Sequence, residues 1–142
     1  MMKRFTRIVC LVLVISALLT IPAYAAEQEQ RSSNFFAAYR AYCYAVSSTK
    51  MEVWFHVIAV GEMDELGSST IEVQRSSDGR HWTTMKTYTK ENYSQMIDTD
   101  TGSHADCVTY TFTAGYYYRA RVQFYAKNSS GTGYLNYYTD KI

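Results

Sequence analysis

Histidine and cysteine are the side chains that metal or acid–base chemistry would use most readily in this sequence. The three histidines are His56, His81 and His104. No two of them have the close spacing of a zinc-binding helix, and the cysteines form no C-x-x-C unit. No serine lies in a G-x-S-x-G elbow. We therefore predict no metal site, no cofactor and no catalytic residues, and we interpret the histidines as structural.

A second group of side chains with possible chemistry is acidic. Asp98, Asp100 and Asp106 lie close together in the sequence, and carboxylates are the hard oxygen ligands that calcium prefers. The stretch lacks the third acidic or asparagine position of the EF-hand pattern, and Gly102 comes one place early. We expect a solvated turn here. Paired carboxylates that hydrolyse glycosides would need a cleft, which spacing alone does not show.

Tyrosine is unusually abundant, at 14 of 142 residues. Strict alternation over residues 116–127 predicts a strand with an inner and an outer face, and residues 133–140 predict a neighbouring strand. Rings and guanidinium groups on the outer face would make an adhesive surface, because they offer large contact area at little rotamer entropy. The predicted binding residues are Tyr117, Arg119, Arg121, Tyr125, Tyr134 and Tyr138.

The same outer face has a second interpretation, in which its side chains only stabilise the sheet. Arg119 or Arg121 would then meet Glu72 on an adjacent strand. Each such cross-strand pair contributes about 0.2–1 kcal/mol.

The first 25 residues have the pattern of a secretory signal peptide. Basic residues stand at positions 3, 4 and 7, residues 8–21 are apolar apart from two hydroxyl side chains, and Ala23-Tyr24-Ala25 is a small-x-small cleavage site. We predict cleavage between Ala25 and Ala26 and a secreted, extracellular protein. The alternative is an uncleaved amino-terminal anchor, although this apolar stretch is shorter than the roughly 20 residues of a membrane span.

Composition limits what the mature chain does. Removing the first 25 of the 142 residues leaves 117, with 11 basic and 13 acidic side chains and a formal net charge of −2. This charge gives no electrostatic reason to expect a nucleic-acid partner, and no second apolar segment suggests a membrane partner after cleavage. Abundant valine, threonine and tyrosine suit the pleated surface of a β-sheet.

The mature chain divides into a flexible leader, residues 26–35, and one domain, residues 36–142. The domain is predicted to be an all-β, seven-stranded sandwich of two sheets. Asp78-Gly79 predicts a tight hairpin, and residues 89–105 are expected to form a long polar loop. The seven predicted strands cover residues 36–46, 51–60, 70–76, 81–88, 107–113, 116–127 and 133–140.

The alternating pattern also predicts which side chains form the core and whether the cysteines pair. Cys43 and Cys107 remain after cleavage, and an even pair in an oxidising compartment usually joins, so we predict a Cys43–Cys107 disulfide. Two free or intermolecular thiols are the alternative. The predicted core consists of Val53, Phe55, Val57, Ile71, Val73, Trp82, Tyr110, Phe112, Tyr118, Val122 and Phe124.

Two segments resemble known proteins. IEVQRSSDGRHW (residues 71–82) and AGYYYRARV (residues 114–122) resemble short secreted proteins of Gram-positive bacteria, many from gut clostridia, that are classed only as a domain of unknown function. The second segment, continued to Gly131, is similar to the last two strands of fibronectin type III domains. The resemblance spans about residues 36–142. It implies a fibronectin-like or immunoglobulin-like sandwich in a secreted bacterial protein, and it brings no catalytic residues.

Together these features predict a secreted, non-enzymatic binding or interaction module. Its partner would be an unknown protein or a cell-surface glycan. One alternative is a small extracellular hydrolase, which would need a polar-lined concave pocket with perturbed titratable groups. Another is an accessory or immunity-type protein that acts on a co-secreted partner.

Overall fold

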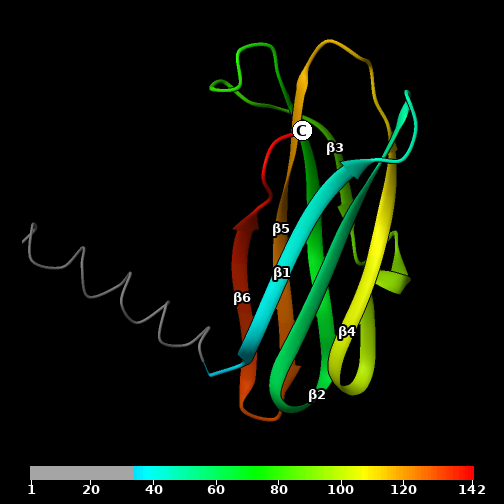
Figure 1. Cartoon of the computed structure of the whole chain (residues 1–142). Coiled ribbons are helices and arrows are strands. Elements are labelled where there is room, and N and C mark those ends of the chain that lie inside the picture. The colour runs from blue at the N-terminus through cyan, green and yellow to red at the C-terminus, as the bar shows by residue number, and fades with distance from the viewer. Residues whose placement is uncertain (1–33) are drawn as a thin grey trace, which may run out of the picture. The chain divides into compact units, whose positions relative to one another are not determined.

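The computed structural model describes residues 34–142, and this part of the chain is nearly all β. The predicted signal peptide and its cleavage site lie outside the described residues. Within residues 34–142 no helix has the length and apolarity to cross a membrane. The elements, shown in Figure 1, are β1 (Phe36–Ala45), β2 (Lys50–Ser76), β3 (Thr83–Thr89), the 3-10 helix η1 (Ser94–Met96), β4 (Ile97–Thr111), β5 (Tyr117–Asn128) and β6 (Gly131–Tyr138).

All six strands of the described region belong to one antiparallel sheet built around β2, which is 27 residues long. On one side, β2 pairs first with β1 and then with β5, and β5 pairs with β6. On the other side, β2 pairs first with β4 and then with β3. The order β1-β2-β5-β6, with β3 and β4 on the opposite edge of β2, therefore makes β2 the strand that connects every other part of the sheet.

The sheet curls because β2 and β4 both bend at the same level. In Figure 1 the two strands turn back at the bottom of the view. Pairing between them breaks from Ile58 to Met63. Gly61 has φ 91°, which glycine adopts without steric cost, and Asp100 in β4 has φ 51°. Gly102 lies close to the bend of β2, where a Cβ atom would be 3.4 Å from the Gly61 carbonyl oxygen.

The bends divide the sheet into two halves that face each other. The first half comprises β1, residues 50–58 of β2 and residues 103–111 of β4. The second half comprises β3, residues 65–76 of β2, the first residues of β4 (97–99), β5 and β6. Across the gap, the Phe124 ring centre lies 6.4 Å from that of Phe55 and 5.6 Å from that of Tyr39. The core therefore forms between the halves.

The predicted inner faces are largely confirmed. Every second residue of β5 from Tyr118 to Ala126 is buried, whereas Tyr116 at the start of the predicted run is exposed. Tyr110 and Phe112 are only half-buried. Trp82 is half-buried too, and it lies over Arg119 on the outer face instead of in the core. The remaining predicted core residues, Val53, Phe55, Val57, Ile71, Val73, Tyr118, Val122 and Phe124, are buried.

The prediction of seven strands in two separate sheets is wrong, because one predicted break lies inside a strand and all six strands of the described region share one sheet. Residues 51–60 and 70–76 are parts of one strand, β2. Ser68 and Ser69 do not form a loop between them. Both are buried, and the Ser68 hydroxyl donates to the Gln123 carbonyl oxygen at 3.0 Å. Polar residues in this position are satisfied inside the sheet, so their polarity does not mark a turn.

The prediction of a long loop over residues 89–105 is also wrong, since β4 begins at Ile97. β4 pairs only with β2, and its first residues are mostly exposed. An exposed edge strand has no need of apolar side chains, which explains why the sequence shows no apolar period there. The hairpin between β2 and β3 is confirmed, with Gly79 at φ 73°.

The predicted leader ends one residue too late. Phe35 is 9% exposed, and its carbonyl oxygen accepts a hydrogen bond from the Val60 N–H at 2.9 Å. Its ring lies against Gly133 of β6, where a Cβ atom would come within 2.6 Å of it. Phe35 therefore belongs to the packed domain.

The predicted Cys43–Cys107 disulfide does not form, and both cysteines are free thiols. β2 lies between them, with Cys43 opposite Val53 and Cys107 opposite Trp54. Neighbouring residues of a strand point to opposite faces of the sheet. Cys43 consequently points into the core, where its sulfur lies 3.3 Å from the Thr139 hydroxyl, while Cys107 points to the outer face.

Candidate binding face

The six residues predicted to bind a partner come from β5 and β6, on the outer side of the second half. Arg119 pairs with Gln74 of β2, and Arg121 pairs with Tyr138 of β6. Tyr125 pairs with Tyr134. Because directly paired residues share a face, the register places the predicted set on one side of the sheet. We call this surface the β5–β6 face.

Arg119 is held between two aromatic rings. Its guanidinium carbon lies 4.3 Å from the ring centre of Trp82, beside β3, and 4.6 Å from that of Tyr138 in β6. Its Nε donates a hydrogen bond to the Gln74 Oε1 at 2.8 Å. A planar guanidinium stacked on rings gains cation–π energy and loses its rotamer freedom. Arg119 therefore fixes the rings on either side of it.

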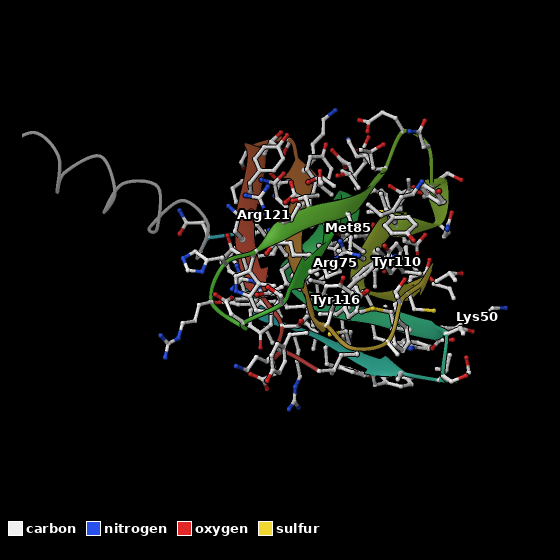
Figure 2. All side chains as sticks on the ribbon, turned by 90° about the horizontal axis from the view of Figure 1, so that it is seen from above. Lys50, Arg75, Met85, Tyr110, Tyr116 and Arg121 are labelled. Atoms are coloured by element: carbon white, nitrogen blue, oxygen red, sulfur yellow. The ribbon has the colours of Figure 1, made fainter. Side chains whose placement is uncertain are left out.

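Arg121 makes the cross-strand pair that the sequence suggested. Its Nη2 lies 2.6 Å from the Glu72 Oε1, and both side chains are partly shielded from solvent. Figure 2 shows Arg121 beside β6, drawn in red. Both guanidinium groups of the β5–β6 face thus have partners within the protein. The solvent-exposed side chains of this face are therefore mainly aromatic. Tyr117, Tyr134 and Tyr138 are 43%, 48% and 48% exposed.

Tyr125 departs from the prediction of an exposed ring, since it is only 4% exposed. The Lys90 ammonium group lies 4.0 Å above its ring centre, and the Tyr134 ring centre is 5.4 Å away. Lys90 also lies 3.5 Å from the Glu65 Oε2. A hydrogen bond with Tyr125 and the charge of Lys90 lower the pKa of Glu65. The segment after β3 therefore covers this end of the β5–β6 face.

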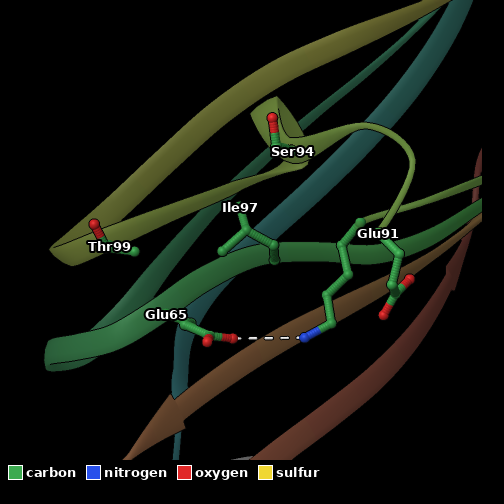
Figure 3. Close-up of a pocket in the computed structure, with 6 residues that line it drawn as sticks. Glu65, Glu91, Ser94, Ile97 and Thr99 are labelled. Carbon is green, nitrogen blue, oxygen red and sulfur yellow. Dashed lines mark ion pairs between the residues drawn. The ribbon is translucent and has the colours of Figure 1, made fainter.

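A shallow hollow of about 320 Å³ opens beside this ion pair, where the segment after β3 leaves the sheet (Figure 3). The Glu65–Lys90 ion pair, drawn as a dashed line, spans one side of it. Its lining combines acidic, basic, hydroxyl and apolar side chains, so no single ligand chemistry is favoured. The lining residues are Glu65, Lys90, Glu91, Ser94, Ile97 and Thr99.

At the opposite end of the β5–β6 face, a rigid turn approaches Tyr117. The Asp78 carboxylate accepts hydrogen bonds from the backbone N–H groups of Arg80 and His81 at 2.8 and 2.9 Å. Its second oxygen lies 2.6 Å from the His81 Nδ1. These bonds hold the pKa of Asp78 well below its usual range, and the bond to Asp78 raises the pKa of His81.

Two further basic side chains each stack on a tyrosine ring close to this end of the domain. The guanidinium group of Arg75 lies 4.2 Å from the ring centre of Tyr116, and Figure 2 shows the two side chains next to each other. The Lys141 ammonium lies 4.9 Å from the ring centre of Tyr117. Basic groups on and around the β5–β6 face are thus stacked on rings repeatedly, which orders the exposed aromatics.

The other histidines and the acidic residues have roles within the sheet. His56 lies 3.2 Å from the Ser103 hydroxyl on the outside of the first half, and the His104 Nε2 lies 2.9 Å from the Gln95 carbonyl oxygen. The predicted acidic turn is instead part of β4, which contains Asp98, Asp100 and Asp106. Among residues 34–142, no three His, Cys, Asp or Glu side chains gather as metal ligands would.

Sequence reasoning missed a second aromatic cluster, on the outside of the first half. Tyr42 and Tyr44 of β1 lie directly opposite Trp54 and Glu52 of β2. The run 51–60 is nearly all apolar, which is typical of a strand that is buried on both faces. The signal that could have revealed the cluster was the acidic Glu52 two residues before Trp54, because an unpaired carboxylate is rarely buried.

No protein-family model matches the chain, and no curated protein is similar to it. Among solved structures, the chain is similar to an X-ray structure described as that of Northeast Structural Genomics Consortium target SoR45, with a TM-score of 0.46 and 8% sequence identity. The similarity covers 78% of this chain and 86% of that one. A likeness at this level says nothing of function.

Proposed function

We propose that this protein is a secreted, non-enzymatic binding module that contacts its partner through the β5–β6 face. The observation that carries the proposal is the fixed position of Arg119 between Trp82 and Tyr138. Two other rings of this face, Tyr117 and Tyr134, are 43% and 48% exposed. Ordered side chains lose little entropy on association, and tyrosine, tryptophan and arginine are enriched among residues that dominate binding energy.

Secretion is supported by the basic start, the apolar stretch and the Ala23-Tyr24-Ala25 site. The expected mature protein begins at Ala26. Intact-mass measurement of protein from the native culture medium tests this directly. A protein that retains Met1 or Met2 would contradict it.

The domain itself is proposed to be an immunoglobulin-like or fibronectin III-like sandwich whose strands run continuously through two corners. In such sandwiches strands A, B and E are neighbours in one sheet, and strands C, F and G are neighbours in the other. The pairings support this correspondence: β1 and β4 flank the first part of β2, and the second part of β2 pairs with β5, which pairs with β6. Membership of the group of secreted Gram-positive proteins is proposed on the two resembling segments alone.

The proposed partner is a protein or a cell-surface glycan of the environment into which the domain is released. The test immobilises the mature protein and passes over it conditioned medium and a surface polysaccharide extract from the producing cells. A Tyr117→Ser, Tyr138→Ser double variant should lose at least tenfold in capture, because exposed rings supply much of an interface's affinity.

The matched control for this experiment is Tyr42→Ser, which removes an equally exposed ring from the outside of the first half. It should leave capture of a protein from the conditioned medium unchanged, because its ring lies outside the β5–β6 face. Equal capture by the double variant and the parent would contradict the proposal, provided that both unfold at the same temperature. Loss of capture in Tyr42→Ser alone would assign binding to the other side of the domain.

A further inference from the structure

The outer side of the first half carries a compact group of rings around one carboxylate, which we call the Glu52 cluster: Tyr42, Tyr44, Glu52 and Trp54. The Glu52 Oε2 accepts hydrogen bonds from the Trp54 Nε1 at 2.7 Å and from the Tyr44 hydroxyl at 3.0 Å. The Tyr42 and Tyr44 rings are nearly parallel, with centres 6.1 Å apart. One carboxylate oxygen therefore orients two rings, and stacking orients the third.

The Glu52 cluster is both ordered and open to solvent. Tyr42 and Tyr44 are 47% and 39% exposed, and Trp54 is half-buried. Its members come from two directly paired strands, so their backbone positions are fixed by the sheet. Hydrogen bonding and stacking already restrict the side chains, which lowers the entropy that a ligand must overcome.

The hydrogen-bonding capacity that remains beside the Trp54 and Tyr44 rings is the second oxygen of Glu52, an acceptor, while the Tyr42 hydroxyl stays available as a donor or an acceptor. The Tyr44 hydroxyl and Trp54 indole N–H both donate to the Glu52 Oε2, whereas no side chain or backbone group of residues 34–142 donates to its Oε1. A ligand that fits must therefore present donors at its edge and an apolar face toward the rings. A pyranose has this character, with hydroxyl donors around its rim and C–H groups on its faces.

The same argument disfavours a proline-rich peptide. Polyproline segments present carbonyl acceptors and no N–H at proline, and they dock on aromatic-lined grooves. The Trp54 indole and the Tyr44 phenol, two of the three donors that could meet those carbonyls, are occupied here by Glu52, and the free Glu52 Oε1 would find no donor at proline.

The charges around the Glu52 cluster disfavour a cationic ligand. Lys50 lies two residues before Glu52 on β2, and Arg40 lies two residues before Tyr42 on β1, so both share the outer face with the cluster. A quaternary ammonium or basic peptide would be attracted by the rings and Glu52 but repelled by these two charges. A neutral or acidic sugar meets no such repulsion.

We propose that the Glu52 cluster is a carbohydrate-binding site for pyranose units that carry no positive charge, with sugar faces on the rings and a sugar hydroxyl donating to the Glu52 Oε1. This site lies on the opposite half from the β5–β6 face and is independent of the function proposed for that face.

The test is calorimetric titration of the mature protein with neutral β-1,4-linked hexasaccharides of glucose, xylose and N-acetylglucosamine, and with the cationic hexasaccharide of glucosamine. At least one neutral hexasaccharide should bind, and the N-acetylated sugar should bind more tightly than its cationic counterpart. Trp54→Ala and Glu52→Ala should each weaken the affinity at least tenfold. Tyr44→Phe keeps the ring and should weaken it less than either.

Tyr42→Ser guards against loss of folding, because this exposed ring donates no hydrogen bond to the protein and the variant should still weaken sugar binding. The Tyr117→Ser, Tyr138→Ser variant should bind sugar normally, which separates this site from the β5–β6 face. The proposal is overturned if no neutral hexasaccharide binds, or if binding survives in both Trp54→Ala and Tyr42→Ser. Binding of a proline-rich peptide in place of the sugars would overturn it as well.

Discussion

The ammonium group of Lys90 lies 4.0 Å above the ring centre of Tyr125, and this contact joins the segment after β3 to the outer side of β5. It makes Tyr125 a structural residue although it points outward from the sheet. The same contact places Lys90 next to Glu65, so that both charges are satisfied within the protein. The exposed rings of the β5–β6 face are accordingly Tyr117 and Tyr138, which lie near Arg119, and Tyr134, which lies next to Tyr125.

Replacement of Tyr125 by serine should destabilise the domain, since the ring is 4% exposed and covered by Lys90. Loss of a buried aromatic costs about 3 kcal/mol. Urea unfolding monitored by tryptophan fluorescence measures the change. Tyr134→Ser, which removes a neighbouring ring that is 48% exposed, should cost less than about 1 kcal/mol. Equal unfolding midpoints for the two variants would contradict the burial of Tyr125.

Phe124→Ala should be more damaging still. The Phe124 ring is fully buried and contacts Phe55 and Tyr39 of the first half. Its removal should lower the free energy of unfolding by about 3–5 kcal/mol, because it leaves a cavity where the two halves meet. The matched comparison is Tyr138→Ala on the outside of the second half. A Phe124→Ala protein as stable as the parent would show that the halves do not pack through this residue.

The two cysteines should be reduced and should differ in reactivity. Burial raises the pKa of both thiols, and Cys43 is the more buried. Ellman's reagent should therefore modify Cys107 in the native protein and Cys43 only after unfolding. Alkylation of denatured, unreduced protein from the medium should label both residues. Protein that takes up no label would contain the disulfide that the structure lacks.

The turn between β2 and β3 should be most stable at mildly acidic pH. The pKa of His81 is raised from 6.5, so the pair's contribution is complete below pH 6.5 and is lost as pH rises through the raised value. The pKa of Asp78 is lowered from 3.8, so its contribution is complete above pH 3.8 and is lost as pH falls through the lowered value. The window of greatest stabilisation therefore lies between about pH 4 and 6.5.

NMR titration of the His81 ring tests this pair, because its apparent pKa should fall toward 6.5 when Asp78 is replaced by asparagine. An unchanged His81 titration in Asp78→Asn would show that the pair does not form.

The sequence predicted the all-β class, the β2–β3 hairpin and the inner face of β5, because each depends on local signals. Asp78-Gly79 supplies the positive φ of the turn, and alternation along β5 reflects burial on one face. The continuity of β2 was not predictable in this way. Ser68 and Ser69 are polar but buried. Their hydroxyl groups donate hydrogen bonds to Gln123, which is at least 54 residues away in the sequence.

The candidate site was predictable only in part for the same reason. The register that brings Arg121 to Glu72 follows from alternation on two strands, and it was anticipated. The burial of Tyr125 depends on where Lys90 lies after the chain leaves β3, which no periodic pattern encodes. The disulfide was wrongly predicted for a similar reason. The face of the sheet on which Cys107 lies depends on its pairing with Trp54 in β2.

Amide chemical-shift mapping is the most direct test of the proposed β5–β6 face. The isotope-labelled mature protein is titrated with the partner captured from the medium or the polysaccharide extract. The largest shifts should occur around Tyr117, Arg119 and Tyr138, and they should disappear in the Tyr117→Ser, Tyr138→Ser variant. Shifts confined to β1 and β4, with β5 and β6 unaffected, would contradict the proposal that this face binds the partner.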